Sequence, residues 1–362
     1  MKQTTRPITS IPEPHAGRLE RARATLRARR LDGYLITHRP DQYWLTGFTG
    51  EDGQVLLTAR GVTLLSDGRF GETAEREAPW ARRVLRKQRT PEPTVREIRQ
   101  SRLTRLGFEP DHLSFRWHDA LRKQAKPTRL VPCEGLIRDL RICKDDGEIE
   151  AIQAAIDVAE AAFLELEPRI RAGMTEREVA AQLVFEMTRR GASGPSFEPI
   201  VASGPHASLP HHEAGDRAIG AGEGVLIDWG ARVGWHVSDL TRMVWPTSIP
   251  RALKTVYTVV KEAHDAAIAV VRPGVKASKV DRVARQIIRD AGHAFVHALG
   301  HGIGLEVHEA PRLGLKSDTT LEAGMVVTIE PGVYLPGVGG VRIESDVLIA
   351  DGGARVLSTL PY

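Results

Sequence analysis

The pattern of apolar and polar residues in the first third of the chain predicts short helices and strands in alternation. A helix is expected over residues 18–30, followed by a strand at GYLIT (33–37). Farther along, the apolar runs QVLLT and VTLLS are separated only by Ala-Arg-Gly, a spacing typical of a tight β-hairpin. We therefore predict a mixed α/β domain over residues 1–140.

A change of pattern after this region predicts a second domain, over residues 141–362. The polar segment 138–146 leads into EIEAIQAAIDVAEAAFLELEPRI, whose apolar residues recur three and four positions apart, as in a long helix. Thr175 and Glu178 have the spacing of a capping box at the start of the next helix, and Gly191 marks its end.

Two parts of the second domain resemble each other at a nearly constant offset. Residues 173–191 resemble residues 274–292, an offset of 101 positions (173 to 274). The segment AGEGVLIDWG (221–230) aligns with AGMVVTIEPG (323–332) at an offset of 102 positions (221 to 323). This indicates two related halves, with a chance similarity of two helix–turn–strand units as the alternative.

The repeat also matches carboxylates between the halves. Asp228 aligns with Glu330. A second acid follows each of them, because Asp239 comes eleven residues after Asp228 and Glu344 comes fourteen after Glu330. If adjacent strands of each half point these acids inward, the two halves share one site.

The overall composition narrows the class of protein. With 362 residues, 41% hydrophobic and 27% charged, the chain is globular and long enough for two or three domains. Its formal charge of +4 comes from arginines scattered among nearly as many acids, without a signature of nucleic-acid binding.

The apolar segments and the cysteine count of the sequence indicate the compartment in which the protein is expected. No run approaches 18 consecutive apolar residues, and the first 18 residues lack the apolar region of a secretory signal, so we expect a cytoplasmic protein without a membrane partner. Cys133 and Cys143 are too few for a disulfide framework and fit a reducing compartment.

Several acids of the second domain are placed where metal ions would explain them. Asp228 follows the apolar run VLI and Glu330 follows VVTI, so each lies at or near the end of a buried strand, where an unpaired carboxylate is costly. Four carboxylates and one imidazole suit a pair of hard divalent ions rather than one structural zinc. The predicted metal ligands are Asp228, Asp239, His301, Glu330 and Glu344.

Two other interpretations explain these residues less well. Arg242 and Arg342 stand close in sequence to Asp239 and Glu344, so ion pairs could explain any single acid, although they explain all five ligands less well. The segment HGIGLEVHE has no glutamate directly after its first histidine and places the second seven residues away, so it does not form an HExxH zinc-protease motif.

The motifs that carry these residues resemble those of the pita-bread metallopeptidase family of prolidases and Xaa-Pro aminopeptidases: SFEPIVASGPHASLPH, IDWG with SDLTR, HALGHGIGLEVHE, TIEPGVY and VRIESDVLI. The segments DGYLITHRPDQYWLTGFTGEDGQVLLT and SDGRF are similar to the creatinase-type N-terminal domain. The resemblance implies an α/β (α+β) fold with a creatinase-like mixed α/β domain followed by a pseudo-two-fold pita-bread catalytic domain.

The same resemblance implies a role for each ligand. Asp228 would chelate one ion, Asp239 and Glu344 would bridge both ions, and His301 with Glu330 would complete the other. Two divalent ions per subunit are expected, with Mn²⁺ favoured and Co²⁺ or Zn²⁺ as alternatives. A hydroxide between the ions would attack the carbonyl that precedes proline, with Glu330 handling its proton.

Further residues are assigned to the substrate by the resemblance. His211 and His308 are expected to contact the substrate or the tetrahedral intermediate, so they join Glu330 as predicted catalytic residues. His297 is expected to line the pocket, and Arg312, in HEAPRLG, to grip the free carboxylate of a dipeptide.

The expected substrates are short proline-containing peptides, cleaved by a homodimer either as Xaa-Pro dipeptides or at the N-terminus of longer peptides. His236 stands where relatives usually carry tyrosine, which bears on pocket shape and substrate preference. Two alternatives on the same fold are a metal-free creatinase-like C–N hydrolase and a non-catalytic module that binds a protein partner. The complete ligand set argues against both.

Overall fold

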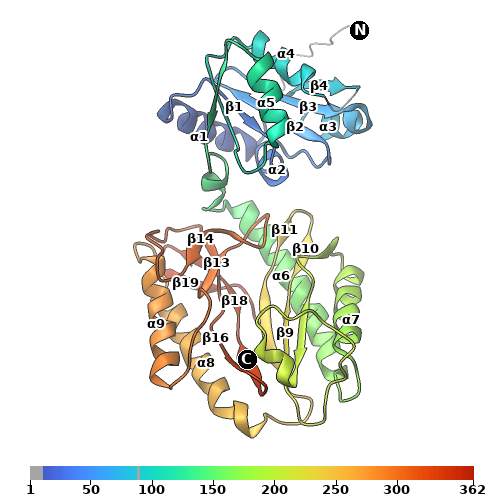
Figure 1. Cartoon of the computed structure of the whole chain (residues 1–362), viewed down its shortest axis with the longest axis vertical. Coiled ribbons are helices and arrows are strands. Elements are labelled where there is room, and N and C mark those ends of the chain that lie inside the picture. The colour runs from blue at the N-terminus through green and yellow to red at the C-terminus, as the bar shows by residue number, and fades with distance from the viewer. Residues whose placement is uncertain (1–10, 88–89) are drawn as a thin grey trace. The chain divides into compact units, whose positions relative to one another are not determined.

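The computed structural model describes residues 11–87 and 90–362. The chain divides into two compact units, Met1–Arg141 and Ile142–Tyr362, and the division falls one residue beyond the boundary expected from the sequence. Figure 1 draws the first unit in blue to green and the second in green to red. No helix in the described part of the chain combines the length and apolar character needed to cross a membrane.

Unit 1 is built on one mixed sheet. Within its described residues the strand order is β4-β3-β2-β1-β5-β6, with β1–β2 and β2–β3 antiparallel and the other pairs parallel. The strands are β1 (Gly33–Ile36), β2 (Gly53–Thr58), β3 (Val62–Asp67), β4 (Arg82–Arg86), β5 (Arg105–Phe108) and β6 (Arg129–Pro132). The helices are α1 (His15–Ala28), α2 (Arg39–Thr46), η1 (Gly68–Phe70), α3 (Gly71–Glu77), α4 (Glu92–Gln100), α5 (Phe115–Gln124) and η2 (Arg138–Arg141).

The elements of unit 1 follow the sequence pattern closely. The predicted hairpin is confirmed as β2–β3, with Leu57 opposite Val62. The first helix was predicted over residues 18–30, but α1 begins at His15 and ends at Ala28. It ends early because Arg30 takes the left-handed conformation (φ 53°) and the Leu31 N–H returns to an earlier carbonyl of the helix.

Unit 2 contains two pairs of helices and several antiparallel sheets. Its helices are α6 (Asp146–Leu166), η3 (Glu167–Arg169), α7 (Glu176–Arg189), η4 (Gly204–Ser208), α8 (Arg251–Val270) and α9 (Ala277–Asp290). Its strands are β7 (Gly194–Pro195), β8 (Ile200–Ser203), β9 (Val225–Trp229), β10 (Ala231–Val233), β11 (His236–Val237), β12 (Leu240–Val244), β13 (Gly300–Gly302), β14 (Glu309–Leu313), β15 (Val326–Ile329), β16 (Gly332–Leu335), β17 (Gly339–Arg342), β18 (Ser345–Ala350) and β19 (Gly353–Val356).

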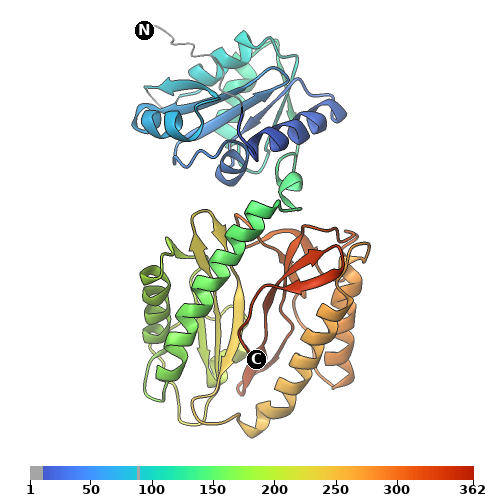
Figure 2. The same ribbon diagram turned by 180° about the vertical axis from the view of Figure 1, so that it is seen from behind.

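The helices of unit 2 pack as two pairs against the strands. Helix α6 packs on α7, β10 and β11, whereas α8 packs on α9, β15 and β17. Figure 1 shows one pair beside each group of strands, and Figure 2 shows α6 and α8 crossing the far side of those strands. Each pair buries its apolar face in its own core, which contains Phe163 and Trp229 in one half and Val260 and Val341 in the other.

The internal repeat predicted from the sequence is confirmed. Helices α7 and α9 have 14 residues each, and both are followed by a glycine with positive φ, Gly191 at 101° and Gly292 at 82°. The predicted capping box of Thr175 and Glu178 is present at the start of α7. In one half β9 lies between β8 and β12, and in the other β15 lies between β13 and β18, all antiparallel.

Candidate metal centre

Equivalent strands of the two halves carry the predicted ligands. Asp228 lies in β9, and Glu330 directly follows β15. Asp239 directly precedes β12, and Glu344 directly precedes β18. His301 lies in β13, next to β15. The halves meet here, because Thr241 and Glu344 form an isolated β-bridge.

Three of the five predicted ligands are especially close together. Asp239, His301 and Glu344 each offer one ligand atom within 4.8 Å of the others. His301 Nε2 lies 3.6 Å from Asp239 Oδ2 and 3.5 Å from Glu330 Oε1. Because His301 Nδ1 donates to the Gly302 carbonyl at 3.1 Å, Nε2 of the neutral ring is the unprotonated nitrogen that faces the carboxylates.

The electrostatics of the cluster favour a cation. Burial, with neighbouring acids adding to it, raises the pKa of Asp239 and of Glu344 well above their ordinary values. Burial also raises the pKa of Glu330 to about 8, and it raises the pKa of Asp228 although Arg342 opposes this. Several carboxyl groups buried together in one site are stable as anions only if a cation is bound among them.

Asp228 turns partly toward an arginine, as the alternative interpretation allowed. Arg342 Nη2 donates to Asp228 Oδ2 at 2.5 Å, so Arg342 pairs with Asp228 rather than with its sequence neighbour Glu344. Arg242 does not pair with Asp239, because it donates to the backbone carbonyls of Thr241 and Glu344 and of the C-terminal residues. Ion pairing therefore accounts for one oxygen of the cluster and leaves the others unexplained.

The remaining donor atoms fit a pair of metal ions. Asp228 Oδ1 is buried and has no hydrogen-bond partner within the described chain. A metal ion would supply the missing partner of this oxygen. Glu344 Oε2 accepts from the Thr241 hydroxyl at 2.6 Å, which fixes that carboxylate in place. Four carboxylates and one neutral imidazole form a donor set suited to hard or borderline divalent ions.

The cluster opens onto a cavity of about 1270 Å³. His308 packs against the predicted ligand His301, with ring centroids 4.4 Å apart in an edge-to-face arrangement. His297 Nδ1 donates to the Ala298 carbonyl at 2.8 Å, and the Tyr334 hydroxyl lies 2.9 Å from its Nε2. The cavity is lined by all five predicted ligands and by His211, His297, His308 and Arg312.

Arg312 is distinctive among the cavity residues. It lies on β14 directly opposite His301 of β13, and its side chain is exposed. Across residues 11–87 and 90–362 its guanidinium has no hydrogen-bond or ion-pair partner, whereas Arg342 in the same cavity is held by Asp228. An unpaired guanidinium facing a cavity is suited to a carboxylate from a ligand.

His236, which was expected to bear on the shape of the pocket, does not line the cavity. It is buried in β11, its Nε2 is 4.0 Å from Glu148 Oε1 of α6, and it is absent from the cavity lining. The expected effect of His236 on the pocket shape is therefore not a direct contact with the cavity.

Two residues near the ligands were missed by the sequence interpretation. Tyr334 accepts from Arg342 Nη1 at 2.8 Å and also reaches His297, while Thr241 joins Arg342 Nε (3.1 Å) to Glu344. Their positions held a weak signal, because Thr241 is two residues after Asp239 and Tyr334 is four after Glu330. Nothing in the spacing indicated which partner each would contact.

Comparison with known proteins identifies the class. Residues 150–351 match metallopeptidase family M24, and residues 18–143 match the Creatinase/Prolidase N-terminal domain. The chain belongs to the M24 metallopeptidase family, with a creatinase/prolidase-type domain preceding its catalytic domain. The fold class and the enzyme class predicted from the sequence are confirmed.

Similar proteins cover nearly the whole chain. It is 36% identical over 331 residues to an Xaa-Pro dipeptidase of Pyrococcus horikoshii, covering 91% of this chain and 93% of that protein. A solved Xaa-Pro dipeptidase from Bacillus anthracis has a TM-score of 0.93 and 35% identity, covering 96% of this chain and 98% of that one. An X-Pro aminopeptidase from Thermotoga maritima has a TM-score of 0.88 and 34% identity, covering 93% and 98%.

Proposed function

We propose that the protein is an Xaa-Pro dipeptidase that cleaves the bond before proline, with two divalent ions held by the five predicted ligands. The observation that carries this proposal is their convergence on one cavity of about 1270 Å³, which is also lined by Arg312, an arginine without a partner among the described residues. The names of the relatives as Xaa-Pro dipeptidases support the substrate class. The proposed metal ligands are Asp228, Asp239, His301, Glu330 and Glu344.

The ions, when bound, would polarise the scissile carbonyl and acidify water. Glu330 is the carboxylate best placed to accept the proton of the attacking water, because its side chain is 18% exposed whereas that of Asp239 is 6% exposed. His211 and His308 are exposed side chains of the cavity that can donate hydrogen bonds to the developing oxyanion. His297, fixed by Tyr334, would form part of the wall that receives the substrate.

Arg312 supports a dipeptidase rather than an aminopeptidase. A dipeptide places the carboxylate of its proline one residue from the cleaved bond, where a free guanidinium can bind it with two hydrogen bonds. Arg312 is opposite the proposed ligand His301 and has no partner in the described residues. A longer peptide has an amide at that position and would not use this charge.

The two alternatives on the same fold are less well supported. A metal-free C–N hydrolase does not need four buried carboxylates, and such a group of acids would cost stability without a cation. A non-catalytic binding module has no need of the unpartnered Asp228 Oδ1. Membership of a metallopeptidase family is also in favour of the enzyme.

Three further features belong to this proposal. The oxygen-rich ligand set favours Mn²⁺, with Co²⁺ or Zn²⁺ as alternatives. Two free cysteines, Cys133 and Cys143, are in keeping with a reducing compartment such as the cytoplasm. We also propose a homodimer, on the resemblance to two-domain relatives alone.

A direct assay tests the proposed reaction. The metal-stripped protein is expected to be inactive, and adding back Mn²⁺, Co²⁺ or Zn²⁺ should restore cleavage of an Xaa-Pro dipeptide faster than that of an Xaa-Pro-Xaa tripeptide. Release of proline and of the N-terminal residue is followed by chromatography. Faster cleavage of the tripeptide would make the protein an aminopeptidase, and no cleavage of either peptide under any ion would reject the peptidase.

Replacing Arg312 by alanine should separate the two specificities. Loss of a charge-assisted bidentate contact is expected to raise KM for the dipeptide by roughly 10- to 100-fold, with little change for the same dipeptide carrying a C-terminal amide. Arg355→Ala, which removes an exposed arginine of β19, is the matched control. An equal change in KM for the acid and the amide would contradict carboxylate recognition by Arg312.

A further inference from the structure

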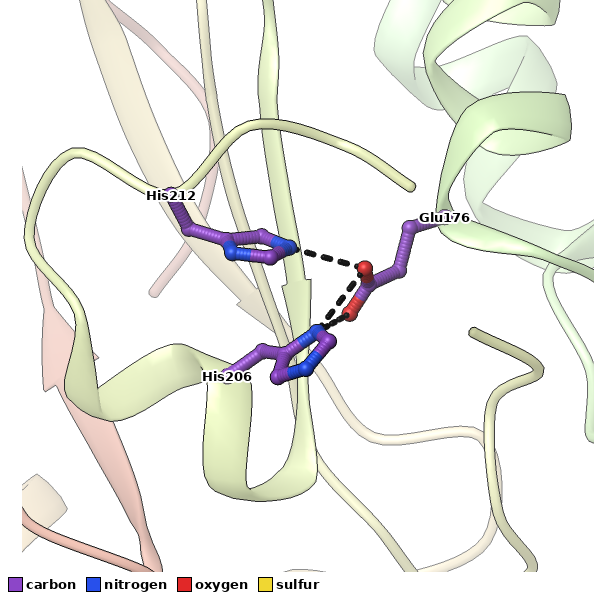
Figure 3. Close-up of side chains that lie close together, drawn as sticks. All are labelled: Glu176, His206 and His212. Carbon is purple, nitrogen blue, oxygen red and sulfur yellow. Dashed lines mark hydrogen bonds and ion pairs between the residues drawn. The ribbon is translucent and has the colours of Figure 1, made fainter. Parts of the chain in front are cut away.

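A second group of metal-ligand side chains lies outside the proposed catalytic centre. Figure 3 shows Glu176, from the first turn of α7, facing the imidazoles of His206 and His212. His212 Nε2 is 2.8 Å from Glu176 Oε2, and His206 Nδ1 is 3.0 and 3.1 Å from the two carboxylate oxygens. The three ligand atoms lie within 4.8 Å of one another.

The two oxygens of Glu176 have different surroundings. Oε1 accepts from both the backbone N–H and the hydroxyl of Ser203, at 2.8 and 2.9 Å, so it anchors the end of β8. Oε2 faces His212 and His206 and is otherwise approached only by the Gly215 N–H at 3.4 Å among the described residues. His206 Nδ1 thus lies near both oxygens, but only Oε1 is also held by Ser203, and Oε2 points into the space between the two imidazoles.

No arginine or lysine among residues 11–87 and 90–362 is paired with this buried carboxylate. Glu176 is fully buried, and the guanidinium of Arg217, which touches Ser203, is paired with Glu223 at 2.6 and 2.7 Å. Burial raises the pKa of Glu176, but the hydrogen bonds from Ser203 and the two histidines outweigh it, and the net direction is downward. Because neither an arginine nor a lysine of the described residues is paired with this carboxylate, a cation held jointly with the two imidazoles would offset its charge.

We propose that Glu176, His206 and His212 form a third metal site, separate from the catalytic pair, for one borderline divalent ion of the Zn²⁺ type. Ligand atoms of a tetrahedral zinc lie roughly 3.3 Å apart, given bond lengths of about 2.0–2.1 Å. The nitrogen-to-oxygen distances of 2.8–3.1 Å are already close to this spacing. The His206 side chain is 37% exposed, so water can reach a fourth position.

The ion would act on the catalytic cavity through one loop. Residues 204–215 carry His206 and His212, and between them this loop holds His211, which lines the cavity. Binding an ion at the base of the loop would fix it to α7 and so hold His211 in place. The site has this role whether or not the substrate is an Xaa-Pro dipeptide.

Metal binding can be measured without the catalytic centre. The background is Asp239→Asn/Glu344→Gln, in which neutral amides replace two carboxyl groups whose burial already favours the neutral form. The metal-stripped full-length variant is titrated with Zn²⁺ by calorimetry, and bound zinc is counted after gel filtration. We expect one Zn²⁺ per chain in this background.

Histidine variants then test which residues hold the ion. Adding His206→Ala or His212→Ala should each abolish the remaining equivalent, or weaken it at least about 100-fold, whereas His293→Ala, at a half-exposed site on another loop, should leave it unchanged. Zinc-dependent slowing of hydrogen exchange in residues 204–215 provides a second readout. Absence of the equivalent, its survival in either histidine variant, or unaltered exchange would overturn the proposal and leave a pair of imidazole–carboxylate hydrogen bonds.

Discussion

Replacing Glu344 by glutamine is expected to abolish binding of both catalytic ions and to lower kcat/KM by at least about 10³-fold, because the amide cannot supply a bridging anion. Glu344 is 2% exposed and is fixed by the Thr241 hydroxyl at 2.6 Å, so glutamine can keep the shape and the hydrogen bond while removing the charge. The effect should therefore appear in metal content and turnover rather than in folding.

The measurement pairs metal analysis with peptide hydrolysis. Glu322→Gln, at an exposed acid that precedes β15, serves as the matched control and should keep full metal content. The metal-free form of Glu344→Gln should be at least as stable as the metal-free parent, since burial makes the ionised Glu344 unfavourable. Retention of two ions and of more than about a tenth of the activity would rule out a bridging role for Glu344.

Removing the metal is expected to make stability fall steeply as the pH rises from about 6.5 to 8. Glu330 and Asp346, a buried residue of β18 that is not a predicted ligand, have pKa values raised to about 8 by burial, so the folded state keeps protons that the unfolded chain has already released. The free energy of unfolding falls with rising pH wherever the folded state binds more protons than the unfolded state, and two such groups give a loss of about 3 kcal/mol across this window. Asp239 and Glu344, with strongly raised pKa values, add to it.

Between pH 6.5 and 8 the buried histidines do not oppose this loss of stability. Burial lowers the pKa of His264, His297 and His301 to about 4, so these groups make stability rise with pH below about 6.5 and contribute little above it. Urea unfolding of the metal-free protein at several pH values between 6.5 and 8 measures the slope. Added Mn²⁺ should reduce the slope, because the ion displaces the protons of Glu330, Asp239 and Glu344 but not that of Asp346, which is not a predicted ligand; a metal-free protein that gains stability toward pH 8 would refute this account.

The sequence predicted those features that depend on local pattern or on the repeat. The β2–β3 hairpin, the capping box at Thr175 and the glycine ends of α7 and α9 follow from short-range rules, and each is present. The carboxylates could be found because equivalent strands of the two halves repeat them at matched positions. Their roles as ligands remain a prediction, supported by distance and burial.

The partners of these residues were not predictable in the same way. Arg342 is two positions from Glu344 but pairs with Asp228, because the register of the strands, rather than sequence distance, decides which side chains meet. The contacts of His206 and His212 with Glu176 join residues 30 and 36 positions apart, from a loop to a helix. Such pairings depend on how whole elements pack together, and the spacing of residues along the sequence does not predict that packing.

The position of the proposed metal centre at the junction of the two halves would give bound ions a mechanical role. Neither cysteine forms a disulfide, so the described chain has no covalent cross-link. Ions held by Asp228 and Glu344 would tie together residues 116 positions apart (228 to 344). Ions that bind only the folded chain add their binding free energy to its stability, about 4 kcal/mol when the free ion is about 1,000-fold above its Kd, and unlike a disulfide they do so reversibly. The supply of metal would then govern how long the enzyme survives proteolysis as well as how fast it works.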